Sequence, residues 1–101
     1  MNTELIEQLI ESELKEVDEK WPDYHSHHEA YAVIKEEAEE LKDKLHLINL
    51  YISTLWISTK NNDVAFYDYR RICNEAKDAI QEAVQVYVTA HRAERLIKNN
   101  K

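Results

Sequence analysis

A block of glutamates in the first half of the 101-residue chain is the strongest candidate for chemistry. It reads Glu36-Glu37-Ala38-Glu39-Glu40. On a helix, residues three and four apart share a face, so Glu40 is a neighbour of both Glu36 and Glu37. Carboxylates at the margin of a helical core repel one another and are costly to desolvate. A hard divalent cation such as Mg²⁺ removes both penalties. The spacing alone leaves open the alternative of a solvated acidic helix face.

A second group of ligands must come from later in the chain, where two pairs have i, i+3 spacing. These pairs are Glu75 with Asp78 and Glu82 with Gln85. Glu82 stands within an apolar run, residues 79–86, where a carboxylate without a role is less expected. The alternative for Glu82 is a residue at the border of the core that pairs with a lysine or an arginine.

The acidic residues are concentrated in one part of the chain. Residues 1–40 hold 13 Asp and Glu against 3 Lys, whereas residues 41–101 hold 7 acidic and 10 basic residues. The net charge of −7 disfavours nucleic acid or an anionic membrane as the main partner. The acidic half therefore either solvates a surface or concentrates carboxylates for a metal.

Composition excludes several other classes of protein. The chain has no Gly, which excludes phosphate-cradling glycine loops and dinucleotide-binding fingerprints. Its one cysteine, Cys73, excludes a disulfide framework and any multi-cysteine zinc site, and it is typical of a reducing compartment such as the cytoplasm. The longest apolar stretch, residues 45–57, is interrupted by polar residues and is shorter than the roughly 20 residues that a membrane span needs.

Capping signals mark two helix starts. Asn2 or Thr3 is a plausible N-cap for a first helix, which Pro22 stops near Lys20. Ser26-His27-His28-Glu29 is a capping box, in which the serine hydroxyl accepts from the Glu29 amide and the glutamate reaches back to the Ser26 amide.

Apolar residues recur every three or four positions in the rest of the chain, which indicates two further long helices. The second helix runs to about Thr59, and its stripe is Ala30, Ile34, Ala38, Leu41, Leu45, Ile48, Ile52 and Leu55. The third follows a turn at residues 60–63, with Asp63 as a candidate cap, and frays after Ile97. Its stripe is Phe66, Tyr69, Cys73, Ala76, Ile80, Ala83, Tyr87, Ala90 and Ile97. Residues 51–59 are rich in β-formers, but their unbroken rhythm favours a helix.

These patterns predict one all-α domain over residues 1–101, built as a long helical hairpin plus a shorter N-terminal helix. Helices of about 30 residues are about 45 Å long, so such a chain encloses little interior. We therefore expect oligomerisation, as a homodimer or homotetramer, to complete a four-helix-type core.

Two segments of the chain resemble phage-type MazG-like proteins, an all-α family of nucleoside triphosphate pyrophosphohydrolases. The first reads His28-Glu29-Ala30-Tyr31-Ala32-Val33-Ile34-Lys35-Glu36-Glu37-Ala38-Glu39-Glu40-Leu41 and resembles the opening of these proteins. Glu82-Ala83-Val84-Gln85-Val86, with Ala90 and Arg92 after it, is similar to their second conserved block. The likeness covers residues 25–45 and 78–95, about a third of the chain.

The resemblance implies a function. The family pattern EExxE followed by ExxD binds Mg²⁺, with Mn²⁺ as a substitute, and the enzymes cleave a (d)NTP between its α and β phosphates. Glu36, Glu37 and Glu40 match EExxE, and Glu82 matches the Glu of ExxD. Gln85 stands where the pattern has Asp.

The second block has a rival in the same helix. Glu75 and Asp78 satisfy ExxD literally about two turns earlier, so both pairs stay candidates. The gap from Glu40 to either pair exceeds the family's usual spacing, and the extra length lies in residues 47–62.

The mechanism implied by the resemblance is metal-assisted hydrolysis of the nucleotide. Glu37, Glu40 and Glu82, with Gln85, would hold Mg²⁺ against the phosphates, while Glu36 orients or deprotonates a water. Cations that could contact the phosphates, if the fold brings them near, are Lys42, Lys44, Lys77 and Arg92.

The alternative function is a non-catalytic helical module that assembles through the stripe from Ala30 to Leu55. The two interpretations differ in one feature. The enzyme requires Glu37, Glu40 and Glu82 to converge within reach of one metal ion, whereas the module requires only that they contact water.

Overall fold

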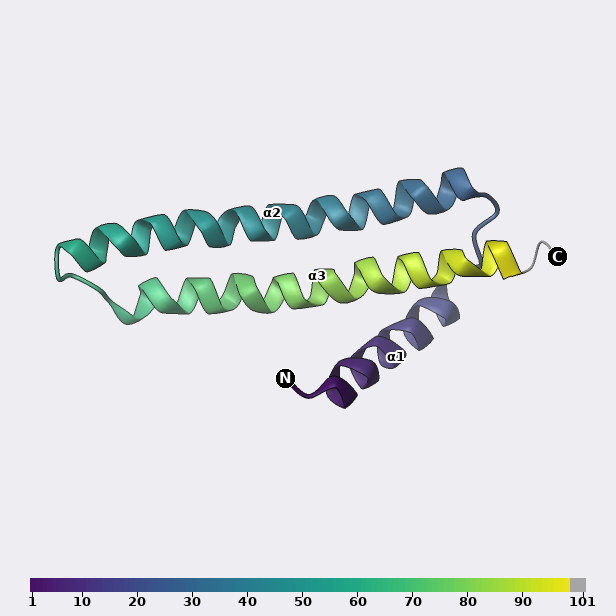
Figure 1. The fold of residues 1–101 in the computed structure, drawn as a ribbon, viewed down its shortest axis with the longest axis horizontal. Helices are drawn as coiled ribbons and strands as arrows, with labels where there is room; N and C mark the ends of the chain where they lie inside the picture. Colours follow the sequence, from purple (N-terminus) through teal and green to yellow (C-terminus); the bar gives the residue numbers. More distant parts are fainter. Residues whose placement is uncertain (99–101) are drawn as a thin grey trace.

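Three helices make up the fold of residues 1–98, the part of the chain that the computed structural model describes. They are α1 (Thr3–Lys20), α2 (His27–Lys60) and α3 (Phe66–Lys98). Helices α2 and α3 form a long antiparallel hairpin, and α1 packs at an angle on the C-terminal half of α3 (Figure 1). This arrangement confirms the predicted all-α class and the order of one shorter and two long helices. The fraying predicted beyond Ile97 falls, after Lys98, outside the described residues.

Local capping explains the first two helix starts as the sequence predicts. The Asn2 side chain accepts from the Glu4 amide at 2.9 Å, and the Ser26 hydroxyl accepts from the Glu29 amide at 3.1 Å. The second half of the predicted capping box differs. The Glu29 carboxylate lies 3.2 Å from His25 Nδ1 instead of bonding the Ser26 amide.

The prediction that Asp63 caps the third helix is wrong, because Asp63 belongs to the end of α2. The Asn62 amide donates to the Thr59 carbonyl at 3.1 Å and the Asp63 amide donates to the Ser58 carbonyl at 2.8 Å. Asn62 has φ 49°, so it supplies the left-handed residue of a Schellman motif without a glycine.

The start of α3 depends on a different aspartate, Asp68, which is buried. Its carboxylate accepts from the Ala65 amide at 2.8 Å, and its own amide donates to the Ala65 carbonyl at 3.0 Å. The Asp68 carboxylate thus serves the amide of the residue at the cap, as the third residue of a capping box does, while alanine at the cap has no side-chain acceptor to offer in return.

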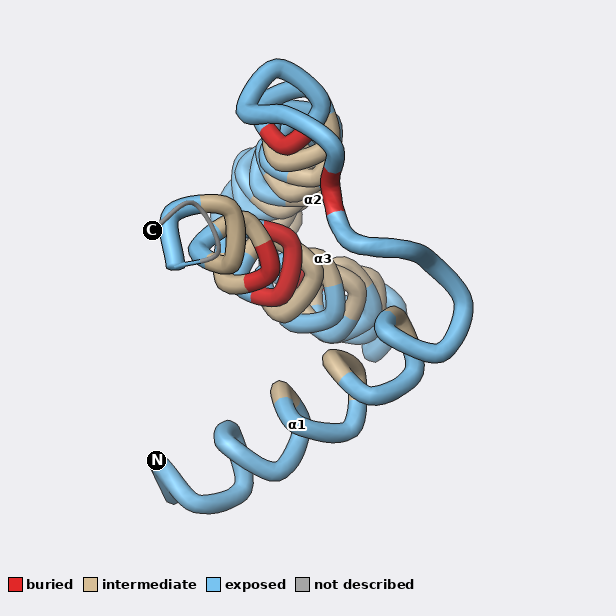
Figure 2. The backbone as a smooth tube through the Cα atoms, turned by 90° about the vertical axis from the view of Figure 1, so that its right-hand side faces the viewer, coloured by how far each residue is buried: buried red, intermediate tan, exposed pale blue. Residues whose placement is uncertain are grey.

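Most of the apolar stripe predicted on α3 faces solvent within one chain. Eight of its nine members are exposed, including Ile80 at 59% and Tyr87 at 50%, and only Ala76 is half-buried. The face that packs on α2 instead uses small and mixed side chains such as Ala79 and Val86. Figure 2 shows the few buried positions on α3, at the start of α2 and in the loop between α1 and α2.

Five of the eight residues in the stripe predicted for α2 are buried or half-buried. Ala30 is buried and Leu41 half-buried, whereas Leu45 and Ile52 are each 49% exposed. The two helices approach closely through only part of each predicted stripe. The rest of each stripe is left uncovered within one chain.

Hydrogen bonds from two arginines of α3 hold the end of α1 and the loop that follows it against the C-terminal half of α3. Arg92, 4% exposed, donates to Asp18 at 2.9 Å and to the carbonyls of Trp21 and Pro22 at 2.9 and 3.0 Å. Arg95 donates to both oxygens of Asp18 at 2.8 Å. The hydrogen bond from Arg95, joined by that from Arg92, lowers the pKa of the Asp18 carboxyl to about 2.

Membrane insertion has no candidate segment in residues 1–98. None of the three helices there combines the length and the apolar character that crossing a bilayer requires.

Candidate metal centre

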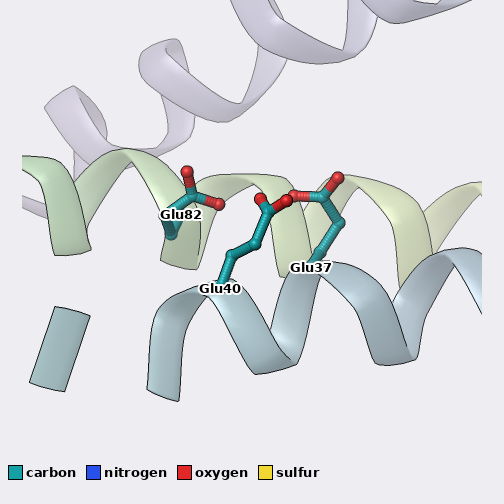
Figure 3. Close-up of side chains that lie close together, drawn as sticks. All are labelled: Glu37, Glu40 and Glu82. Atoms are coloured by element: carbon teal, nitrogen blue, oxygen red, sulfur yellow. The ribbon is translucent and has the colours of Figure 1, made fainter. Parts of the chain in front are cut away.

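Three carboxylates from the two long helices meet at one point. Glu37 and Glu40 lie one turn apart on α2, and Glu82 extends toward them from α3 (Figure 3). One oxygen from each side chain lies within 4.8 Å of the other two. Around a bound Mg²⁺, adjacent ligand oxygens are about 3.0 Å apart and opposite ones about 4.2 Å, so the side chains would have to rotate inward to coordinate one ion.

The Glu37 carboxyl is strongly perturbed by this arrangement. Burial, followed by the charges of Glu40, Glu82 and Glu36, raises its pKa from 4.5 to about 7. At neutral pH the group is thus held near its titration midpoint, where a cation and a proton compete for the same oxygens.

Glu82 brings a buried oxygen to the cluster. Burial raises the pKa of Glu82 and the neighbouring Glu40 raises it further, whereas Glu37 and the charge of Lys44 act in the opposite direction. The Glu82 Oε2 atom is buried, and no hydrogen-bond partner for it exists within the described part of the chain. A buried acceptor without a donor is costly, and a cation bound by the three carboxylates would remove that cost.

The rival pair on α3 is occupied by an ion pair. Lys44 of α2 lies 3.4 Å from Glu75 and 3.5 Å from Asp78. The Glu75 charge raises the pKa of the Lys44 ammonium, with a further contribution from Asp78. The geometry therefore favours Glu82, and not Glu75 or Asp78, as the partner of the α2 carboxylates.

Two further predicted site residues lie beside the three carboxylates. Glu36 is exposed on α2, and its charge acts on Glu37. The side-chain amide of Gln85 donates a short hydrogen bond to Glu13 of α1. Gln85 thus ties α1 to α3 in this structure, one turn from Glu82.

Two of the four cations considered for phosphate contact already bind other groups of the protein. Arg92 holds Asp18 and two backbone carbonyls, and Lys44 holds Glu75 and Asp78. Both act on the scaffold around the carboxylates, which the family motif alone did not indicate.

A cavity of about 500 Å³ adjoins the cluster at Glu37, the one of the three carboxylates that lines it. It lies between the end of α1, the first turns of α2 and the C-terminal half of α3, and Glu36, Glu37, Gln85 and Arg92 contribute to its walls. The spacing of the glutamate motifs did not predict this cavity. The signal for it was Pro22, which ends α1 and allows the chain to turn back along α3.

Comparisons with protein-family models, with curated proteins and with solved structures find no match to this chain. The chemistry of the site must therefore be argued from its own residues.

Proposed function

We propose that this protein is a Mg²⁺-dependent nucleoside triphosphate pyrophosphohydrolase that converts a (d)NTP to the (d)NMP and pyrophosphate. Mn²⁺ could replace Mg²⁺ at the same oxygens. The observation that carries the proposal is the convergence of Glu37, Glu40 and Glu82, in which a buried Glu82 oxygen lacks a donor among the described residues. The MazG-like spacing of Glu36, Glu37 and Glu40 supports the same assignment.

The roles of the side chains follow from their positions. Glu37, Glu40 and Glu82 supply an all-oxygen set of hard ligands, the kind that Mg²⁺ prefers, and leave further coordination positions for water and phosphate. When bound, the metal would neutralise the charge that develops on the phosphate oxygens. Glu36 is exposed beside this set, where it can orient a water or accept its proton.

The decisive experiment is a pyrophosphate-release screen over the (d)NTPs with Mg²⁺, in wild type, Glu40→Gln and Glu39→Gln. We expect release from at least one substrate, its loss in Glu40→Gln, and its retention in Glu39→Gln, because Glu39 is exposed and outside the cluster. Equal release by wild type and Glu40→Gln would refute the proposed site.

Calorimetry tests the metal step separately from turnover. Titration of Mg²⁺ or Mn²⁺ should give binding heat with wild type and Glu39→Ala, and none with Glu37→Ala. Equal heat in all three proteins, or heat in none, would remove the metal centre from the proposal.

We further propose that two or more copies associate through the stripe of α3 that faces solvent. A 12.0 kDa monomer is expected to expose about 6,000 Å², whereas this chain exposes 7795 Å². Its radius of gyration is 17.8 Å, against about 13 Å for a compact domain of this length. The 3/4 spacing of the stripe is typical of helices that pack along a seam, and a homodimer or homotetramer would bury it.

The second candidate function is a non-catalytic assembly module. The sequence predicts assembly through the stripe from Ala30 to Leu55, but most of that stripe is buried or half-buried within one chain, and the exposed stripe of α3 is the face that supports a module. Both functions include association of copies, so the oligomeric state does not distinguish them. Pyrophosphate release that depends on Glu40 distinguishes them, because only the enzyme would show it. A cytoplasmic location fits the enzyme, since nucleotides and reduced cysteines such as Cys73 occur there.

A further inference from the structure

The cavity beside the metal centre has the position expected of a pocket for the organic part of a substrate. Glu37 lines the cavity and is also one of the three clustered carboxylates. A molecule seated in the cavity would therefore extend its phosphates toward Glu40 and Glu82. The cavity volume of about 500 Å³ lies within the range of small-molecule sites in proteins.

Two aromatic residues give the cavity a surface on which a planar ring can stack. Tyr24 is buried in the cavity wall, where its ring lies 5.3 Å from the Arg92 guanidinium and its hydroxyl donates to the Thr89 carbonyl at 3.2 Å. Trp21 is 65% exposed, although its backbone is fixed by hydrogen bonds to Arg92 and to Val17. An exposed indole on an anchored backbone is suited to stacking against a nucleobase.

The polar groups of the α2 wall are carboxylates. Glu29 and Glu36 lie seven residues apart on one face of α2, with Val33 between them, and all three line the cavity. An ionised carboxylate only accepts hydrogen bonds. The wall therefore suits a ring edge with amino groups and disfavours an edge with a carbonyl in that place.

We propose that this cavity binds the nucleobase of the substrate, stacked on Trp21, and selects bases with an exocyclic amino group over uracil and thymine. This inference rests on the proposed function only in taking the bound base to be part of a nucleotide whose phosphates reach the metal centre. Cytosine, adenine and guanine each offer an amino group to Glu29, which lies about two turns of α2 from Glu37, whereas uracil has a carbonyl oxygen at the position of the cytosine amine.

Nucleosides without phosphate and without metal test the pocket alone. Cytidine and uridine are a matched pair, since they differ in the amine or carbonyl at one ring carbon. The chain has two tryptophans, so amide-correlation NMR resolves two indole N–H signals, and Trp56 near the far end of the hairpin is an internal control. Each nucleoside is titrated to about 10 mM, which detects millimolar affinity.

We expect cytidine to shift the Trp21 indole signal and leave that of Trp56 in place, with uridine binding at least about fivefold more weakly. In the double variant Glu29→Gln, Glu36→Gln the preference for cytidine should disappear, because a carboxamide can also donate to a carbonyl. The matched control Glu16→Gln, Glu39→Gln changes exposed glutamates outside the cavity and should keep the preference.

Three results would overturn the inference: an unchanged Trp21 signal, equal affinity for cytidine and uridine, or equal shifts of both tryptophans. Its failure can be told from failure of the proposed function. Mg²⁺ binding and pyrophosphate release without a shift of Trp21 would refute the pocket alone. A selective shift of Trp21 in a protein that neither binds Mg²⁺ nor releases pyrophosphate would refute the hydrolase alone.

Discussion

Glu37 connects the stability of the protein to its capacity for binding a cation. Burial and three neighbouring carboxylates raise the pKa of this group to about 7, so the fold favours its protonated form. The stabilisation from that proton is complete below the ordinary value of 4.5 and is lost as the pH rises through about 7. A metal ion that binds the same oxygens must displace the proton.

The metal-free protein should therefore lose thermal stability as the pH rises from about 5 to about 8. Mg²⁺ affinity should increase over the same interval, because fewer protons compete for the ligand oxygens. Thermal unfolding followed by circular dichroism, and calorimetry at several pH values, measure the two effects. Glu37→Gln should flatten the stability profile, whereas Glu39→Gln should leave it unchanged. A stability profile that rises through neutral pH would contradict this account.

Substitutions at Glu82 and Glu75 should have opposite effects on stability, although both glutamates lie on α3. Glu82→Gln removes a buried charge that forms no ion pair in residues 1–98, so the metal-free protein should gain roughly 1 kcal/mol in unfolding free energy. Glu75→Gln takes a partner from Lys44 and should cost roughly 1 kcal/mol. Urea unfolding without and with Mg²⁺ measures both variants, and only Glu82→Gln should lose the added stability that Mg²⁺ gives. A loss of stability in metal-free Glu82→Gln would contradict the prediction.

At the scale of the elements, α1 is the least anchored of the three helices. None of its residues, all within the described part of the chain, is buried. Leu14 and Val17 are only half-buried, and the polar bonds that hold α1 to α3 come from Glu13 and Asp18. Since α1 borders the cavity, the attachment of this helix determines the shape of the proposed pocket.

Asp18→Asn should loosen α1 by roughly 1 kcal/mol, because it weakens the charge-assisted bonds to Arg92 and Arg95. Hydrogen exchange measured by mass spectrometry should show faster exchange in α1, with the centre of the α2–α3 hairpin unchanged. Glu16→Gln is the matched control, because it breaks an exposed pair with Lys20 and should have little effect. Equal exchange in the two variants would show that Asp18 is not the anchor.

A helix boundary was predictable from the sequence where a single capping residue or proline determines it. It was less predictable where one residue could cap either the end of one helix or the start of the next. Asn2, Ser26 and Pro22 each act on the adjacent turn, and the structure confirms all three. Asp63 could serve either the end of α2 or the start of α3. Sequence alone did not show that its amide would complete the cap of α2, nor that Asp68 would take over the start of α3.

At the scale of the whole molecule, the exposed stripe on α3 should control association. Light scattering after gel filtration should give a dimer or tetramer for wild type, and a monomer for Ile80→Glu together with Tyr87→Glu, because charges at a buried seam are not tolerated. Asn74→Glu adds the same type of charge at an exposed α3 position outside the stripe and should keep the oligomer. A wild-type monomer at micromolar concentration would refute association through this face.

The sequence by itself determined the helical class, the helix order and the carboxylates worth considering, because capping and 3/4 periodicity depend on residues a turn apart. Only the tertiary structure decided which face of α3 meets α2, and so which glutamates meet. Apolar residues occupy more than one face of α3, and periodicity does not reveal which face a neighbouring helix covers. Packing against α2 brought Glu82 beside Glu37 and Glu40, paired Glu75 with Lys44, and left the most regular stripe exposed.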